Sequence, residues 1–287
     1  SRPLVVFAFL LLVAGIATAD QLTVNSIIVS QKAGAPPENI IALVEKMGCR
    51  PVLIPPCADI VASGGPAGRA RAIAAMARTL DCLVGPGGAD VDPSIYGEAN
   101  TASRNTNVVR DRFEADFVRT ALDCELFGFG ICRSHQLWNA AAGGRLIQNV
   151  EGHEDGRHGL RVKKRSMIFE ATRQQALRVN SLHHQVVDFT GWGFRVVGRE
   201  DTGMIEATER WNGITTQFHP ELMQEDPNQR ALFATVGRRA HAFAIWKDLR
   251  TSGHGTIPTL VAKMREDPRF YDSDIAWAKR DLSRHVR

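Results

Sequence analysis

Short apolar runs alternate along the first third of the chain with segments whose apolar residues recur at helical spacing. The runs at 27–29, 51–55 and 82–84 predict short strands buried on both faces, because such strands need no polar alternation. Between them, residues 38–47 place apolar residues on one helical face, and residues 69–80 are rich in alanine. Both segments predict helices. This order of elements predicts a parallel sheet with helices on both faces.

The pattern changes character in the middle of the chain. Residues 110–125 predict a helix, the apolar run 126–131 predicts a buried strand, and residues 134–142 predict another helix because two glycines follow them. Further strands are expected at 145–148, 161–170, 194–199, 204–208 and 213–218. Because these strands lie close together in the sequence, they predict an antiparallel portion. The expected fold is α/β, a doubly wound and mostly parallel sheet flanked by helices, with this portion added.

Both ends of the chain are set apart from that sheet. A charged start, an apolar run at 4–16 and small residues up to Ala19 predict a signal peptide over residues 1–19, cleaved after Ala19. A membrane anchor is the alternative, but the run is shorter than the ~20 residues that a span needs. We expect a secreted or periplasmic protein with one domain at 20–250. Residues 251–287 predict a C-terminal helical extension on the surface.

Composition adds little that is specific. The chain of 287 residues is 44% hydrophobic and 23% charged, which is enough apolar material for a real core. The net charge of +4 is scattered rather than gathered in a stripe, so no nucleic-acid partner is expected. The oligomeric state stays open, a homo-oligomer included.

No residue pattern indicates a metal or a cofactor, and we expect neither. The five cysteines, at 49, 57, 82, 124 and 132, show no CxxC pair and no zinc-ligand spacing. Their odd number leaves at least one thiol free or paired outside the chain. His153 and His158 also fit no standard ligand spacing, and they favour a surface or pocket-edge loop.

Cys132 stands where the predicted strand 126–131 meets the next helix. A strand that turns sharply into a helix with a nucleophile at the corner is a nucleophile elbow. The helix N-terminus would favour the thiolate over the thiol. The alternative is a small buried hydrophobe, as most free cysteines are. A redox-sensing thiol would need a resolving partner, and Cys124 on the preceding helix offers no obvious path.

The strand at 213–218 delivers His219 to its carboxyl end, with Glu221 two residues later. A thiol nucleophile needs a base and the base needs an orienting group, so Cys132, His219 and Glu221 are the candidate catalytic residues. Main-chain N–H groups near Gly88 and at Arg133 are candidates for an oxyanion hole. The alternative for the glycine pair at 87–88 is a plain tight turn.

Together these segments resemble the class I glutamine amidotransferase-like superfamily, and within it most the γ-glutamyl-γ-aminobutyrate hydrolase family. The motifs that carry the resemblance are residues 86–93 with 96–98, Arg110 and Asp111 with Glu114, residues 130–133 with Gln136, residues 180–181 with 183–185, and residues 217–221. One departure is Ser134, where the family usually has glycine. We expect that change to be tolerated at a cost of about 1 kcal/mol.

The resemblance implies hydrolysis of a small-molecule γ-glutamyl amide through a thioester on Cys132, without a cofactor. It also implies the roles given above to His219 and Glu221. The charged ends of a glutamyl substrate need polar partners, and the candidates are Gln136, Arg110, Asn180 and His183. Two alternatives stay open: a glutaminase subunit that supplies ammonia to a synthetase, and an inactive member that binds a γ-glutamyl ligand. The leaving amine is also open.

Overall fold

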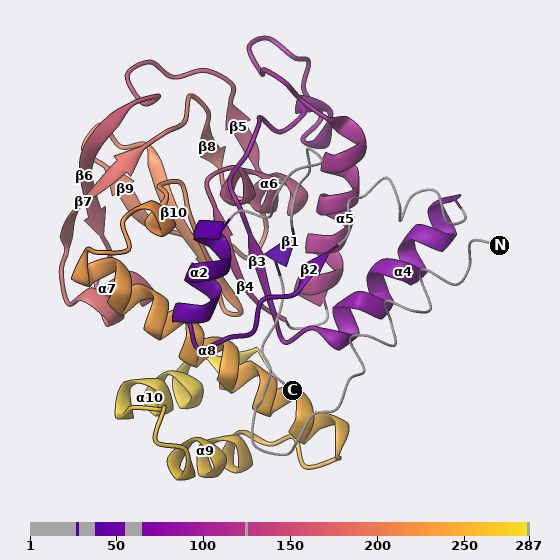
Figure 1. Ribbon diagram of the computed structural model, residues 1–287, viewed down its shortest axis with the longest axis vertical. Helices are drawn as coiled ribbons and strands as arrows, with labels where there is room; N and C mark the ends of the chain where they lie inside the picture. Colours follow the sequence, from indigo (N-terminus) through magenta and orange to yellow (C-terminus); the bar gives the residue numbers. More distant parts are fainter. Residues whose placement is uncertain (1–26, 29–37, 55–64, 124–125, 286–287) are drawn as a thin grey trace.

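The computed structural model describes residues 27–28, 38–54, 65–123 and 126–285. The predicted signal peptide, the last residue of the strand expected at 27–29 and two of the five cysteines lie outside these ranges. The described residues form one sheet of eleven strands with helices packed on it (Figure 1). The α/β prediction is therefore confirmed.

One half of the sheet is parallel. Its strands follow the spatial order β2 (Leu53–Ile54), β1 (Ile27–Ile28), β3 (Cys82–Gly85), β4 (Phe127–Ile131) and β11 (Gly213–Thr216). Every neighbouring pair in this order runs parallel. Strands β3, β4 and β11 are thus adjacent although they are far apart in the sequence, and their carboxyl ends meet at one edge.

Helices cover both faces of this parallel half. One face packs against α2 (Glu38–Lys46) and α8 (Pro227–Thr251), the other against α4 (Gly65–Thr79), α5 (Val108–Asp123) and α6 (Arg133–Ala141). Strand β4 explains the division, because its phenylalanines and Ile131 belong to the core cluster that includes α8 residues. A methyl group added at Gly128 would lie 2.5 Å from the Trp138 ring of α6. Glycine on that face lets α6 approach the sheet closely.

The other half of the sheet is antiparallel, as predicted. From β11 the order continues through β10 (Ile205–Arg210), β9 (Arg195–Glu200), β6 (Gly156–Val162) and β7 (Ala176–Ser181). Strand β8 (Val186–Phe189) pairs with β10 and with β5 (Arg145–Ile147). The sequence pattern did not indicate β7 and β8, because the polar cluster between them resembles a loop.

The strand expected at 161–170 is wrong except for its first two residues. β6 ends at Val162, and Met167–Thr172 forms helix α7. The Ser166 hydroxyl accepts a hydrogen bond from the Phe169 N–H, which caps the helix. A cap of this kind outweighs the strand preference of a short apolar run.

The C-terminal segment is helical and contributes side chains to the core. Helices α9 (Ile257–Glu266) and α10 (Asp272–Arg280) lie against α8 (Figure 1). Leu260, Met264 and Trp277 are buried in the same core cluster as the α8 residues. Short 3₁₀ turns complete the described chain at Pro93–Ile95, Pro220–Leu222 and Leu282–Arg284. None of the helices in the described ranges has the length and apolar character that a membrane crossing needs.

Candidate active site

Three strand ends build the site. Register pairs Gly85 with Gly130 and Thr216 with Ile131, so β3, β4 and β11 end level with one another. The residues that follow these strands are therefore neighbours in space. They are the glycine turn after β3, Cys132 after β4 and the segment from Gln217 to His219 after β11.

Cys132 occupies the turn between β4 and α6. Its backbone has φ 49° and ψ −106°, outside the usual range of a residue with a side chain. Such a conformation costs of order 1–3 kcal/mol and persists only where the surroundings impose it. The Cys132 N–H donates to the Thr216 carbonyl at 2.7 Å, which fixes the turn against β11. The first N–H groups of α6 have no partner within the helix and follow directly.

His219 lies between Cys132 and Glu221. Its Nδ1 is 2.6 Å from Glu221 Oε1, and Cys132 is close enough to the ring to contribute to its pKa. A methyl group added at Gly87 would lie 2.6 Å from His219 Cε1 and 3.5 Å from Cys132 Cβ. Burial opposes a charge on the ring, but Cys132 and Glu221 outweigh it and raise the pKa of His219 to about 10. The ring therefore carries its second proton at neutral pH, next to an acidic group on each side.

Asn180 is used differently from the expectation that it contacts substrate. Its side-chain Nδ2 donates to the His219 carbonyl at 2.9 Å, and its Oδ1 accepts from the His219 N–H at 2.8 Å. Both polar ends of the amide are occupied by one residue. Asn180 thus fixes the main chain of His219 and lies outside the lining of the cavity described next.

A small cavity of about 120 Å³ opens beside Cys132. Its lining residues are Gly88, Asp90, Cys132, Gln136, Glu154, Leu182, His183, His184 and Gln185. Three of the residues expected around a substrate therefore line it: Gly88, Gln136 and His183. Gln136 Nε2 donates to the Gln185 carbonyl at 2.9 Å and to Gln217 Oε1 at 3.1 Å, which orients its amide.

Sequence reasoning missed several residues of this lining. Asp90, His184 and Gln185 lie inside the motifs that carried the family resemblance, but nothing in their spacing assigned them a function. His184 Nε2 is 2.7 Å from Asp90 Oδ2, an interaction across the cavity wall that only the fold reveals. Glu154 belongs to the charged loop that was expected at the surface or at a pocket edge, but its sequence context assigned it no role.

Arg110 lies above Gly88 rather than in the lining. Its Nε donates to Glu114 Oε1 at 2.8 Å, while its buried Nη2 has no hydrogen-bond partner. A methyl group added at Gly88 would lie 3.2 Å from that Nη2. A guanidinium nitrogen with an unused donor thus lies next to the glycine turn.

The charge-dense start of α5 is buried, not a solvated first turn. The Arg133 guanidinium forms ion pairs with both Asp111 and Glu114, and none of the three is more than 4% exposed. Burial alone would raise the pKa of Glu114, but Arg133 and Arg110 outweigh it and hold that pKa below its usual value. This network attaches α5 to the first residue of α6. The Arg133 side chain is occupied there, so only its N–H is free for an oxyanion hole.

The Ser134 side chain is accommodated between the start of α6 and the glycine turn after β3. Its buried hydroxyl donates to the Pro86 carbonyl at 2.7 Å. A methyl group added at Gly85 would lie 2.5 Å from Ser134 Oγ, so glycine at that position makes room for the hydroxyl. The serine therefore ties the start of α6 to the glycine turn after β3.

Comparisons with known proteins agree with this arrangement. The chain matches the peptidase C26 family over residues 13–221. It is 33% identical to the glutamine amidotransferase-like protein YvdE of Lactococcus lactis over 162 residues, which is 51% of this chain and 68% of that protein. It is 26% identical to protein NtpR of Enterococcus hirae over 207 residues, 65% of this chain and 81% of the relative.

Solved structures share the fold. The glutaminase domain of Trypanosoma brucei CTPS, with bound acivicin, superposes with a TM-score of 0.56 at 13% identity, covering 75% of this chain and 94% of that one. A glutamine amidotransferase from Thermotoga maritima gives 0.51 at 14% identity, covering 82% and 100%. The family match spans well over half of the chain and includes Cys132, His219 and Glu221. The chain therefore belongs to the peptidase C26 family of the class I glutamine amidotransferase-like superfamily, whose members are cysteine-type hydrolases or amidotransferases that act on C–N bonds.

Proposed function

We propose that this protein hydrolyses a γ-glutamyl amide through a γ-glutamyl thioester on Cys132. The observation that carries the proposal is the position of His219, next to Cys132 on one side and 2.6 Å from Glu221 on the other. A nucleophile, a base and an orienting carboxylate in that sequence of contacts are what thiol-dependent acyl transfer requires.

Acylation begins from the ion pair of the Cys132 thiolate and the His219 imidazolium. The sulfur attacks the γ-carbonyl carbon of the substrate, and the carbonyl oxygen takes the negative charge. His219 Nε2 then gives its proton to the amide nitrogen as the C–N bond breaks and the amine leaves. Glu221 holds the ring by Nδ1 and stabilises its charged form. The product on the enzyme is a γ-glutamyl thioester.

Deacylation uses the same groups in reverse. The neutral His219 takes a proton from a water molecule, whose oxygen attacks the thioester carbonyl. The C–S bond breaks, free glutamate leaves and the Cys132 thiolate returns beside the imidazolium. Main-chain N–H groups near Gly88 and at Arg133 stabilise the oxyanion in both steps, each by about 3 kcal/mol at the transition state.

Charge and hydrogen-bonding capacity support a glutamyl substrate. The unused Nη2 of Arg110 suits an α-carboxylate. The lining also contains two carboxylates, Asp90 and Glu154, which suit an α-ammonium. Gln136 and His183 line the same cavity as the two carboxylates. The buried Oε1 of Gln185 has no hydrogen-bond partner and adds an acceptor in the same wall.

The test is hydrolysis of a panel of γ-glutamyl amides with different amines, read as release of glutamate. Cys132→Ala is expected to abolish turnover and to keep the fold. Cys49→Ala is the matched control, because Cys49 is buried away from the site and burial raises its pKa to about 12. Turnover by Cys132→Ala would exclude the mechanism. No turnover of any amide by the parent chain would exclude the function.

The similar structures favour a second candidate, because one of them is a glutaminase domain. On that alternative the substrate is glutamine and the released ammonia passes to a synthetase. The two candidates differ in selectivity. A glutaminase would prefer glutamine over amides with bulky amines and would gain activity with a partner protein, whereas a γ-glutamyl hydrolase would accept the larger amines alone.

A further inference from the structure

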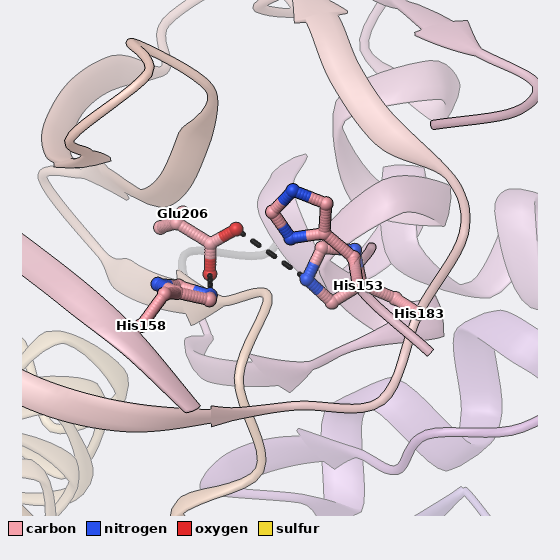
Figure 2. Close-up of side chains that lie close together, drawn as sticks. All are labelled: His153, His158, His183 and Glu206. Atoms are coloured by element: carbon pink, nitrogen blue, oxygen red, sulfur yellow. Dashed lines mark ion pairs between the residues drawn. The ribbon is translucent and has the colours of Figure 1, made fainter. Parts of the chain in front are cut away.

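Three histidines and one glutamate gather behind the cavity wall. His158 is on β6, His183 follows β7, Glu206 is on β10 and His153 is on the loop before β6. One nitrogen from each imidazole and one Glu206 oxygen all lie within 4.8 Å of one another. Figure 2 shows the Glu206 carboxylate joined by dashed lines to His158 and His183, with the His153 ring beside them. We call these four residues the histidine–glutamate cluster.

Hydrogen bonds to the main chain fix which nitrogens face the carboxylate. His158 Nδ1 is 3.1 Å from the Gly159 carbonyl, and His183 Nδ1 is 3.1 Å from the Gln185 carbonyl. A carbonyl oxygen only accepts, so both Nδ1 atoms carry a proton. In the neutral tautomer each Nε2 is then a bare lone pair. The two Nε2 atoms lie 3.6 Å and 3.4 Å from the two oxygens of Glu206.

The lone pair of each Nε2 thus faces a carboxylate oxygen inside the protein, and His183 Nε2 also lies 3.3 Å from Ser181 Oγ. Glu206 is fully buried, and neither of its oxygens has a hydrogen-bond partner. The Nε2 of His158 also lacks one. A single proton on Glu206 would bridge only one of the two imidazoles. A cation placed among them would satisfy all of these acceptors at once.

Spacing and chemistry match a transition-metal ion. Ligand atoms about 2.0–2.1 Å from a tetrahedral ion lie about 3.4 Å from each other, close to the two separations that involve Glu206. His153 is on the loop before β6, and its ligand nitrogen lies within 4.8 Å of the other three ligand atoms. Imidazole nitrogens select zinc-like ions over calcium or magnesium. A metal-bound histidine usually donates its other ring N–H to a carboxylate or a main-chain carbonyl. The Nδ1 atoms of His158 and His183 have such carbonyl partners.

The charges around the cluster agree with the geometry. Glu200 Oε2 lies 3.6 Å from His153 Nε2 and adds a second carboxylate next to the cluster. The surroundings favour a bound positive ion.

We propose that His153, His158, His183 and Glu206 bind one divalent transition-metal ion of the zinc type. Four protein ligands fill a tetrahedral site, so the ion has a structural role. It ties β6, β10 and the segment after β7 together. Since His183 also lines the cavity, the ion would hold the wall that faces Cys132. The ligands come from four separate segments, which is why linear spacing did not indicate a site.

The test measures metal binding on the full chain and needs no turnover. Cys132→Ala serves as the parent, because it removes the Cys132 sulfur next to the cavity as a competing ligand. After chelator treatment, equilibrium dialysis against Zn²⁺ should give one ion per chain by elemental analysis. Co²⁺ should give the intense visible absorption of a tetrahedral site without a thiolate charge-transfer band.

Two variants and one control locate the ion. Glu206→Gln and His158→Gln should each weaken Zn²⁺ binding at least about 100-fold, since each removes a direct ligand. His241→Gln should bind like the parent, because His241 hydrogen-bonds Gly48 far from the cluster. Circular dichroism checks that each variant is folded.

Three results would overturn the proposal: a parent that binds no ion at micromolar Zn²⁺, variants that bind as tightly as the parent, or a Co²⁺ spectrum dominated by thiolate. If one variant does not fold, the other and the parent's Co²⁺ spectrum still decide. None of these readouts depends on whether γ-glutamyl amides are hydrolysed.

Discussion

Single positions determine how closely the reacting groups approach. Glycine at 87 leaves room for the His219 ring beside Cys132, because any side chain there would meet the ring at 2.6 Å. Asn180 holds the main chain of His219 from the other side with two hydrogen bonds. The imidazole is thus fixed by its neighbours as well as by Glu221. Fixed positions of this kind are what acyl transfer needs, since a small displacement of the base is costly in rate.

Changing Glu221 to glutamine tests the charge on His219. The pKa of His219 is raised to about 10 in part by Glu221, so removing the carboxylate charge must lower it. His219 has to be protonated to donate to the leaving amine. The alkaline limb of kcat/KM, which we expect near pH 10 in the parent, should therefore move to lower pH in Glu221→Gln. Glu225→Gln is the matched control, because that side chain is 98% exposed. If the alkaline limbs of kcat/KM superimpose for the parent, Glu221→Gln and Glu225→Gln, the assignment of this limb to His219 is wrong.

Residues of the site differ in how far the sequence could reveal them. Cys132 and His219 could be predicted because each follows a short apolar strand, and parallel strands bring their carboxyl ends together. Asn180 was placed near the site, but its contact with His219 depends on how β7 lies relative to β11. The histidine–glutamate cluster could not be predicted, because its four side chains meet only through the order of the antiparallel strands.

At the level of elements, β4 and α6 fit together through glycine. The alternation of phenylalanine and glycine in β4 gives one face to the core shared with α8 and leaves the other open to α6. This pattern was visible in the sequence as a glycine-punctuated strand. Helix α7, in contrast, was not visible in the sequence pattern. Its apolar residues suggested a strand, and the Ser166 cap decided for a helix.

Glu114→Ala tests how α5 and α6 are joined. Removing this carboxylate leaves Arg133 and Arg110 buried without one of their counter-charges, so the free energy of unfolding should fall by about 3–5 kcal/mol. Urea unfolding followed by circular dichroism measures it. Arg161→Ala is the control, because its ion pair with Asp201 is 72% and 63% exposed, and it should cost less than about 1 kcal/mol. An equally small effect at Glu114 would show that the network does not join the helices.

At the scale of the whole molecule, the parallel half was the predictable part. Alternating strands and helices specify its connectivity, since parallel neighbours need a crossover helix between them. The sequence predicted that the second half of the sheet is antiparallel, but it did not predict the spatial order of its strands. The strands β7 and β8 are short, and their pairing depends on strands that are distant in the sequence. The C-terminal helices were expected on the surface. Their burial depends on contacts with α8 that no local pattern indicates.

Trp277→Ala tests whether the C-terminal helices share the main core. The indole is 6% exposed and contacts Phe243 of α8 at a ring-centre distance of 6.0 Å. We expect a loss of about 3–5 kcal/mol in the free energy of unfolding, in one cooperative transition. Trp192→Ala is the control and should cost under about 1 kcal/mol, because that side chain is 80% exposed. A separate early transition confined to the C-terminal helices would contradict a shared core.

If every substrate passes through one thioester on Cys132, hydroxylamine should intercept it. Hydroxylamine competes with water for a γ-glutamyl thioester and gives a γ-glutamyl hydroxamate. If the thioester is common to all substrates, the ratio of hydroxamate to glutamate at fixed hydroxylamine concentration must be the same whichever amine has left. Cys132→Ala should give neither product. Ratios that change with the leaving amine, or hydroxamate formed by Cys132→Ala, would contradict the account.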